Sequence, residues 1–413
     1  MPDQHLTDPH LSTPAGKPRA RSLGIPFGGV PGRWNAITDV PGVEIGYTTL
    51  IEGDAVRTGV TAIHPRGAAG AGDPVAAGFF SQNGNGEMTG VSWIAESGTF
   101  AGPVAITNTH AVGVAHAGII AWAVRRHPVL AEVWLLPVAA ETWDGYLNDI
   151  NGHHVTEQTV VDALESAAAG PPEEGSVGGG TGMNCYGFKG GSGTASRLVG
   201  YGPSTHTVGV FVQANFGSRT ELTLAGLPLG RMLADDNPMA DYFASELGPT
   251  ATPSPRSPSP RSPSPRSPSL RSPLPPGAGS VIAIVGTDAP LLPHQCQALA
   301  RRVTLGLART GTTGSHFSGD LFVAFSTGNP GGITAGPSPA GPGHYDRVDF
   351  IPWNYIDPFY EAVVQATEEA VANALVANED MTGRDGHRSP ALPRDRVAAV
   401  FRARPDPTSP DPR

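Results

Sequence analysis

GSVIAIVGTDAPLLPHQ, residues 279–295, holds the clearest passage from a strand to a helix in this chain. The apolar, β-branched run that starts at Ser280 predicts a strand. Asp288 is then expected to cap a helix that ends at Gly311. The apolar side of that helix would be formed by Leu292, Cys296, Leu299, Val303 and Leu307.

Similar signals occur on both sides of this stretch. Short apolar runs predict strands at residues 43–51, 102–107, 131–139, 206–216 and 320–327. Apolar residues at helical spacing predict helices at 110–126, 159–169, 357–378 and 394–402. Strands in both halves of the chain, each flanked by helices, predict a layered α/β sandwich.

The composition changes in three places. Residues 1–22 and 403–413 are polar and contain proline, so both ends are expected to be disordered. Residues 253–272 repeat PSPRS with one variant, PSLRS, and an insertion over 250–276 is expected to be extended and solvated. Its arginines could bind an acidic partner and its serines could be phosphorylated, but a tolerated loop insertion is favoured. The insertion would separate two chains of one domain, residues 23–402.

Charge and cysteine content narrow the class of protein. The 413 residues carry a net charge of −10, which argues against a nucleic-acid partner. Two cysteines, Cys185 and Cys296, are too few for a disulfide framework and lack the spacing of a zinc site. Neither a signal peptide nor an apolar run of 18 residues is present, which predicts a soluble, cytoplasmic protein with no membrane partner.

The Gly279–Ser280 junction suggests a self-cleavage site. Gly279 has no Cβ, so the peptide bond could be strained and the Ser280 hydroxyl could approach the preceding carbonyl. Attack would form an ester, and water would release a chain that starts at Ser280. Its new α-amine, with a pKa of about 8, could act as the general base for the same residue. Taken alone, a Gly-Ser pair before a strand is weak support for this chemistry.

Several longer motifs strengthen the hypothesis: NAITDVPGVEIG (35–46), ETWDGYLNDINGHHV (141–155), GGTGMNCYGFKGGSGTASR (179–197), VQANFG (212–217), LARRVTLGLARTG (299–311) and SGDLFVAFST (318–327). With residues 279–295, they resemble the family of L-aminopeptidase/D-Ala-esterase-amidases and β-peptidyl aminopeptidases. The resemblance covers residues 22–402, apart from the repeat. It implies a four-layer αββα sandwich, like that of N-terminal-nucleophile hydrolases but differently connected.

The resemblance also implies a proenzyme split into an α-chain, residues 1–279, and a β-chain, residues 280–413. Such enzymes release the N-terminal residue from small peptides, amides or esters that have a free amine, with no metal and no cofactor. They act as assemblies of several αβ units, here expected to number four.

The site residues follow from the same resemblance. Ser280 matches the nucleophile, and Ser318 and Asp320 match its neighbours, with Ser318 orienting the Ser280 hydroxyl or amine. Asn215 and Tyr146 match side-chain donors to the oxyanion. Glu141 matches the carboxylate that pairs with the free amine of the substrate, and Trp143 would line the same pocket.

Plainer structural interpretations of these residues stay open on the residues alone. Asn215 could end a strand, Tyr146 could belong to the core, and Ser318 with Asp320 could form a turn. The glycine-rich segment 178–196 lacks the pattern of a phosphate-binding loop and is expected to be a loop packed around the site. The histidines lack metalloprotease spacing, and neither cysteine has a partner that would make it a nucleophile.

Two other functions remain alternatives. One is an acyltransferase of the ornithine acetyltransferase type, which also cleaves itself, but before Thr rather than Ser. The other is a non-catalytic, uncleaved scaffold that binds through the repeat.

Overall fold

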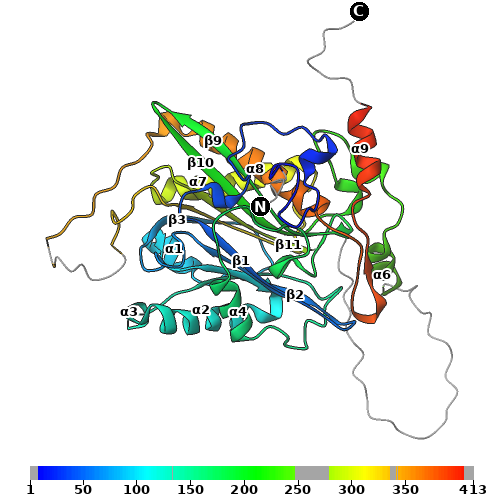
Figure 1. The fold of residues 1–413 in the computed structure, drawn as a ribbon, viewed down its shortest axis with the longest axis horizontal. Coiled ribbons are helices and arrows are strands. Elements are labelled where there is room, and N and C mark those ends of the chain that lie inside the picture. Colours follow the sequence, from blue (N-terminus) through cyan, green and yellow to red (C-terminus); the bar gives the residue numbers. More distant parts are fainter. Residues whose placement is uncertain (1–7, 133, 247–278, 335–340, 342, 404–413) are drawn as a thin grey trace, which may run out of the picture.

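The structure is a computed structural model that describes residues 8–132, 134–246, 279–334, 341 and 343–403. Two sheets pack face to face, and helices cover the outer face of each (Figure 1). The predicted αββα sandwich is therefore confirmed. The repeat insertion and residues 404–413 lie outside the described residues.

The larger sheet has six strands, in the order β4 (Thr99–Phe100), β3 (Val75–Gly84), β12 (Ser318–Ser326), β11 (Gly279–Thr287), β10 (Ser204–Asn215) and β9 (Gly191–Tyr201). Its central strand β11 runs parallel to β12 and antiparallel to β10. The smaller sheet has the order β1 (Glu44–Glu52), β2 (Val56–His64), β5 (Val104–Asn108) and β6 (Val138–Thr142).

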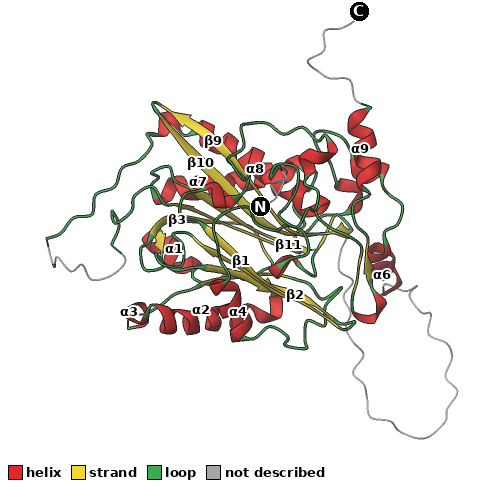
Figure 2. Ribbon diagram, viewed as in Figure 1, coloured by secondary structure: helices red, strands yellow, loops and turns green. Residues whose placement is uncertain are grey.

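Three apolar layers hold the sandwich together. Ile282 and Ile284 of β11 lie in the cluster between the sheets, whereas Val281 and Val285 face α7 (Pro293–Arg309) and α8 (Asp357–Val376). Because β11 is buried on both faces, its sequence is continuously apolar. Beneath the smaller sheet, a third cluster packs α2 (Val112–Arg126) and α4 (Glu157–Glu165) (Figure 2).

Shorter elements complete the described fold. The helices are α1 (Val91–Ser97), α3 (Pro128–Ala131), α5 (Leu229–Met232), α6 (Pro238–Glu246) and α9 (Arg394–Arg402). The remaining strands form two small hairpins, β7 (Asn184–Cys185) with β8 (Phe188–Lys189) and β13 (Met381–Thr382) with β14 (Arg388–Ser389).

Several predicted boundaries are wrong. The strand expected at 131–139 begins only at Val138, after Pro137, where β6 pairs with β5. Asp288 does not cap α7, because its carboxylate accepts a hydrogen bond from the Thr207 amide at 2.6 Å. The helix begins instead at Pro293, whose missing N–H and fixed φ suit a first turn.

The glycine-rich segment is not a loop throughout. Its second half forms β9, a long strand of the larger sheet that pairs with β10. The glycines there permit close packing, since a Cβ on Gly193 would lie 2.1 Å from the carbonyl oxygen of Ala370 on α8. Small residues in this strand let the helix approach the sheet.

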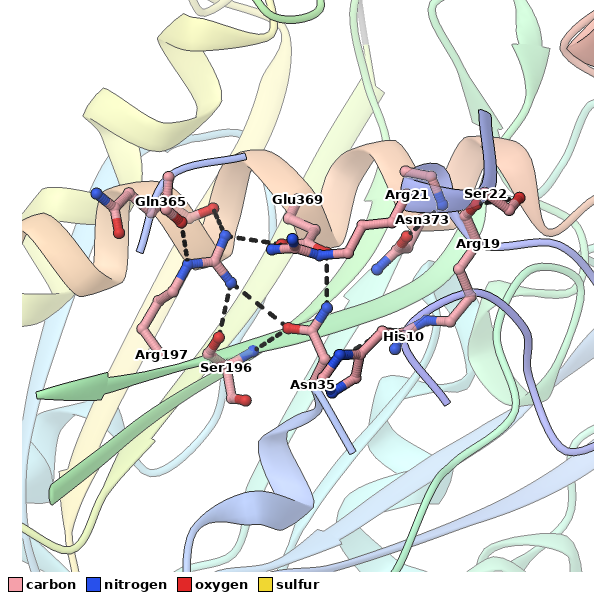
Figure 3. A network of polar contacts seen from close by, with 12 residues as sticks. His10, Arg19, Arg21, Ser22, Asn35, Ser196, Arg197, Gln365, Glu369 and Asn373 are labelled. Atoms are coloured by element: carbon pink, nitrogen blue, oxygen red, sulfur yellow. Dashed lines mark hydrogen bonds and ion pairs between the residues drawn. The ribbon is translucent and has the colours of Figure 1, made fainter. Parts of the chain in front are cut away.

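Residues 8–22 of the N-terminal segment pack against the rest of the fold, contrary to the disorder predicted for them, and residues 1–7 lie outside the described residues. Arg19 is 3% exposed, and its guanidinium contacts Glu174 at 2.7 Å. Arg21 donates two hydrogen bonds to Glu369 of α8, which Arg197 of β9 also contacts (Figure 3). The buried Arg19 and the partly buried Arg21 attach the segment to the rest of the fold, which polar composition alone does not reveal.

Candidate active site

Ser280 lies near the start of the central strand of the larger sheet. It pairs with Asn215 of β10 on one side and with Gly319 of β12 on the other. Its side chain faces the layer between the sheets, on the same side of β11 as Ile282, because side chains alternate along a strand. Ser280 is 2% exposed.

The Ser280 hydroxyl oxygen accepts hydrogen bonds from two donors. The backbone N–H of Trp143 lies 3.2 Å from Oγ, and the Asn215 amide nitrogen lies 3.5 Å from it. The Asn215 side chain also donates to the Trp143 carbonyl at 2.9 Å, and its Oδ1 accepts a hydrogen bond from the Asn184 backbone N–H at 2.9 Å. The amide of Asn215 is thus fixed in orientation with its donor toward Ser280.

Trp143 contributes a group that the sequence did not predict. That Trp143 lines the pocket for the substrate amine stays a prediction; its indole lies over Gly145, where a Cβ would come within 2.6 Å of the ring. The part of Trp143 that reaches Ser280 is its backbone N–H. A backbone donor of this kind suits an anion that develops beside the hydroxyl.

Gly279 is required by packing. A Cβ there would lie 2.1 Å from the Asn215 carbonyl oxygen, far inside van der Waals contact. Gly279 is absent from the residues with positive φ, so the expected backbone strain at the junction has no support in its φ angle. Its lack of a side chain lets β10 lie against the junction.

Ser318 and Asp320 form a hydrogen-bonded pair on the neighbouring strand. The Ser318 hydroxyl donates to Asp320 Oδ1 at 2.5 Å, and Asn83 donates to Oδ2 at 2.8 Å. Ser318 pairs with Gly279 and Asp320 with Val281, so both flank the junction along the backbone. Burial raises the pKa of Asp320, outweighing hydrogen bonds from Ser318, Asn83 and the Val281 backbone. The direct contact expected between Ser318 and the Ser280 hydroxyl stays a prediction.

Glu141 lies at the end of β6, two residues before Trp143, and is 2% exposed. Its Oε1 accepts a hydrogen bond from the Glu87 backbone N–H at 2.8 Å, and its Oε2 accepts one from the Thr109 hydroxyl. Burial raises the pKa of Glu141 despite these donors. A buried carboxylate with fixed oxygens is suited to binding a cationic group.

Tyr146 is held by the C-terminal hairpin. Its hydroxyl donates to the Arg388 carbonyl at 3.2 Å, and its ring stacks on His387 with centroids 4.8 Å apart. Burial raises the pKa of Tyr146 to about 12, so the phenol keeps its proton as a donor must. Donation from Tyr146 to an oxyanion stays a prediction, and it would require exchange of the bond to Arg388.

Sequence reasoning missed four residues that support the site: Asn83, Glu87, Thr109 and Asn184. Each acts on a predicted residue through one hydrogen bond, to Asp320, Glu141 or Asn215. The available signal was NGNGE, residues 83–87, where alternating Asn and Gly follow a strand. Such residues favour tight turns with exposed backbone donors.

Other chemistries find no support in the described residues. No cluster of three or more His, Cys, Asp or Glu that could hold a metal occurs among them. In the same residues, no helix combines the length and apolar character needed to cross a membrane. Lys189 of the glycine-rich segment is buried and donates to the carbonyls of Met183 and Gly190, at 2.8 and 2.7 Å.

Known proteins similar to this chain have the same overall architecture. The chain is 43% identical to an L-aminopeptidase D-Ala-esterase/amidase from Ochrobactrum anthropi, described as a new variant of the Ntn hydrolase fold. The match covers 94% of this chain and 99% of that one, with a TM-score of 0.81. A β-aminopeptidase from Burkholderia sp. is 41% identical, with 94% and 100% covered and a TM-score of 0.79. The fold is therefore that of an N-terminal-nucleophile hydrolase variant.

Sequence comparison leads to the same group. The β-peptidyl aminopeptidase BapA of Sphingosinicella microcystinivorans is 44% identical over 398 residues, which cover 93% of this chain and 92% of the relative. The BapA protein of Sphingosinicella xenopeptidilytica is 43% identical, with 94% and 92% covered. The model of peptidase family S58 matches residues 35–389, which include all the candidate site residues. The chain therefore belongs to peptidase family S58.

Proposed function

We propose that this aminopeptidase of family S58 cleaves its own chain between Gly279 and Ser280 and then uses Ser280 as its nucleophile. The observation that carries the proposal is the pair of donors, the Trp143 N–H and the Asn215 amide, on the Ser280 hydroxyl oxygen. Processing would give an α-chain of residues 1–279 and a β-chain of residues 280–413.

Self-cleavage follows from attack by Ser280 Oγ on the Gly279 carbonyl carbon. The C–N bond of the peptide breaks, the nitrogen takes up the proton that the Ser280 hydroxyl gives up and becomes the free amine of Ser280, and Gly279 becomes an ester on Oγ. Water then hydrolyses that ester. Asp320, which accepts a hydrogen bond from Ser318, pairs along the backbone with Val281, the residue after Ser280, and its carboxyl would share a proton with the new amine.

Turnover repeats the chemistry on an external acyl group. The Ser280 amine, with a pKa of about 8 when unperturbed, takes the hydroxyl proton as Oγ attacks the substrate carbonyl. The N–H of Trp143, the Asn215 amide and Tyr146 are the donors proposed for the oxyanion, each worth about 3 kcal/mol. The bond to the leaving amine or alcohol then breaks, that group departs with the proton held by the Ser280 amine, and water hydrolyses the acyl ester on Oγ to release the acid.

Glu141 makes the reaction specific for a free N-terminus. Its ionised carboxylate would pair with the substrate ammonium, and a blocked amine would leave this buried charge without a partner. As the pH falls, Glu141 takes up a proton and the site loses its affinity for cationic amines. Because burial raises the pKa of Glu141, this loss should begin at a higher pH than it would with an ordinary glutamate.

The substrates proposed are small peptides, amides and esters that begin with L-amino acids, D-alanine or β-amino acids. Relatives named for β-peptides and for L-amino acids and D-Ala esters or amides support this range. The match to a peptidase family favours hydrolysis over the acyltransferase and scaffold alternatives.

We also propose that several αβ units, four in number, assemble in the cytoplasm. Exposed aromatic side chains in the segment that precedes α8 support association, because Tyr345, Trp353 and Tyr355 are 83%, 49% and 59% exposed. Two free, buried cysteines suit a reducing compartment. Sedimentation of the purified protein as a single αβ unit would contradict the assembly.

The function is tested with the p-nitroanilide of an N-terminal amino acid and its N-acetylated form. Wild-type protein should hydrolyse only the free amine. Ser280→Ala should abolish release of p-nitroaniline, because no other hydroxyl occupies that position. Ser315→Ala, which changes a serine outside the proposed site, is the control that should retain activity. Full activity of Ser280→Ala would refute the assignment of the nucleophile.

A further inference from the structure

A short turn joins the two halves of the candidate site. Residues 85–87 follow β3, and the Asn85 side chain donates to the Phe317 carbonyl at 2.9 Å, just before β12 begins. Two residues on, the Glu87 backbone N–H donates to Glu141 Oε1 at 2.8 Å. The turn therefore contacts both the strand beside Ser280 and the carboxylate proposed to bind the amine.

Gly86 forms the closest contact in this turn. A Cβ on Gly86 would lie 2.9 Å from the Gly319 Cα and 3.2 Å from Glu141 Oε1. The reverse holds for Gly319, where a Cβ would lie 2.6 Å from the Gly86 Cα. Gly86 does not have a positive φ, so backbone conformation does not explain the glycine. The two glycines are needed because the turn and β12 approach so closely.

The two neighbours of Gly86 belong to different parts of the candidate site: Gly319 lies beside the nucleophile, and Glu141 is the carboxylate proposed to bind the amine. Gly319 is the residue that pairs with Ser280, so it moves with the nucleophile's strand. Glu141 Oε1 is tied to the turn by the Glu87 N–H, whereas Oε2 accepts its hydrogen bond from Thr109, outside the turn. A change in the separation between turn and strand therefore acts on Oε1 and on its distance from the nucleophile.

We propose that the Gly86–Gly319 contact fixes the distance between the Ser280 hydroxyl and the Glu141 carboxylate, and so sets the preference between α- and β-aminoacyl substrates. This inference rests on the proposed function. In an α-aminoacyl group one carbon separates the amine from the carbonyl, and in a β-aminoacyl group two carbons do. The difference is one C–C bond, about 1.5 Å.

A methyl group at residue 86 should lengthen that distance. Its contact with the Gly319 backbone cannot be relieved by a rotamer change, so the turn has to move away from β12. Glu141 Oε1 follows the turn through the Glu87 N–H, and the added methyl, 3.2 Å from Oε1, also presses on it. The longer β-aminoacyl group then spans the site better than the α-aminoacyl group.

The test compares L-alanine p-nitroanilide with β-alanine p-nitroanilide, which are isomers that differ only in the position of the amine. Gly86→Ala should raise the β-to-α ratio of kcat/KM about tenfold over the wild type, because a misplacement of about 1 Å costs up to a hundredfold in rate. Gly84→Ala is the matched control, since a Cβ there meets nothing within 4 Å. Its ratio should equal that of the wild type. An unchanged or lower ratio for Gly86→Ala would overturn the inference.

A second variant covers the case in which Gly86→Ala does not fold. Glu141→Asp keeps the charge but withdraws the carboxylate by one methylene, so it should also raise the β-to-α ratio. A ratio that falls or stays constant would contradict the inference while wild-type activity leaves the proposed function intact. Absence of wild-type activity on both substrates would instead reject the function itself.

Discussion

At the scale of single residues, Asp144 is a carboxyl near the site whose ionised form is disfavoured by burial. Asp144 is completely buried beside Trp143, and its Oδ1 accepts a hydrogen bond from Asn148 at 3.1 Å. Burial raises the pKa of Asp144 to about 7, against hydrogen bonds from Thr58 and Asn148 that lower it. Near neutral pH this carboxyl is therefore only partly ionised.

The raised pKa has a definite sign for stability. Between about pH 4, where an unfolded aspartate ionises, and pH 7, the folded chain holds a proton that the unfolded chain has lost. The free energy of unfolding therefore falls as pH rises through this window, by up to roughly 4 kcal/mol. Asp144→Asn should remove this loss, so that the variant gains stability relative to the wild type at pH 8 and not at pH 4.

Urea unfolding of both proteins at the two pH values measures the effect. Asp162→Asn, at an exposed residue of α4, is the control and should behave like the wild type at each pH. The assignment fails if the stability difference between Asp144→Asn and the wild type is the same at pH 4 and pH 8.

The sequence predicted which residues lie in the site, but it did not always predict which of their atoms contact Ser280. Ser280 and Asn215 were predicted as site residues, and the structure places them opposite each other on adjacent strands. Trp143 was predicted for its indole, whereas its backbone N–H reaches Ser280. Backbone donors such as those of Trp143 and Glu87 carry no sequence signal, because every residue except proline has one.

At the scale of secondary-structure elements, the N-terminal segment and α8 are joined by one buried carboxylate. Glu369 of α8 is 0% exposed and binds Arg21, Arg197 and the Asn35 amide. Burial alone would raise the pKa of Glu369, but the hydrogen bond from Arg21 and the charges of both arginines lower it. Figure 3 shows these groups converging on α8 from the segment and from β9.

Glu369→Gln should therefore destabilise the fold strongly. The change leaves the buried guanidinium of Arg197 and the partly buried one of Arg21 without their counter-charge, which typically costs about 3 to 5 kcal/mol. Glu368→Gln is the matched control on the preceding residue of α8, because Glu368 contacts the half-exposed Arg309 and its replacement should cost less than about 1 kcal/mol.

Urea unfolding in a Ser280→Ala background gives both free energies from one uncut chain. Equal losses for the two variants would show that the buried cluster contributes no more than a surface pair.

Helices whose apolar residues recur at helical spacing were predicted better than strands whose position depends on packing against distant parts of the chain. Helix α9 matches its predicted residues, and α8 lies within the range predicted for it. Strand β9 was taken for a loop because small residues dominate it, and β2 and β3 were not predicted. Their places depend on contacts with distant elements such as α8, which a local pattern does not record.

At the scale of the whole molecule, the proposed cut divides one sandwich into two chains that share the larger sheet, while the smaller sheet belongs to the α-chain alone. The larger sheet takes β3, β4, β9 and β10 from the α-chain, and β11 and β12 from the β-chain. The candidate site lies where β10 and β11 meet, so it needs both chains. The resemblance in sequence predicted this architecture, but not the buried contacts of Arg19 and Arg21.

The central claim is cleavage between Gly279 and Ser280, and N-terminal sequencing of the purified wild-type protein tests it most directly. The account predicts two chains, one of which begins SVIAIVG from Ser280. A single intact chain in a preparation that hydrolyses aminoacyl p-nitroanilides would contradict it.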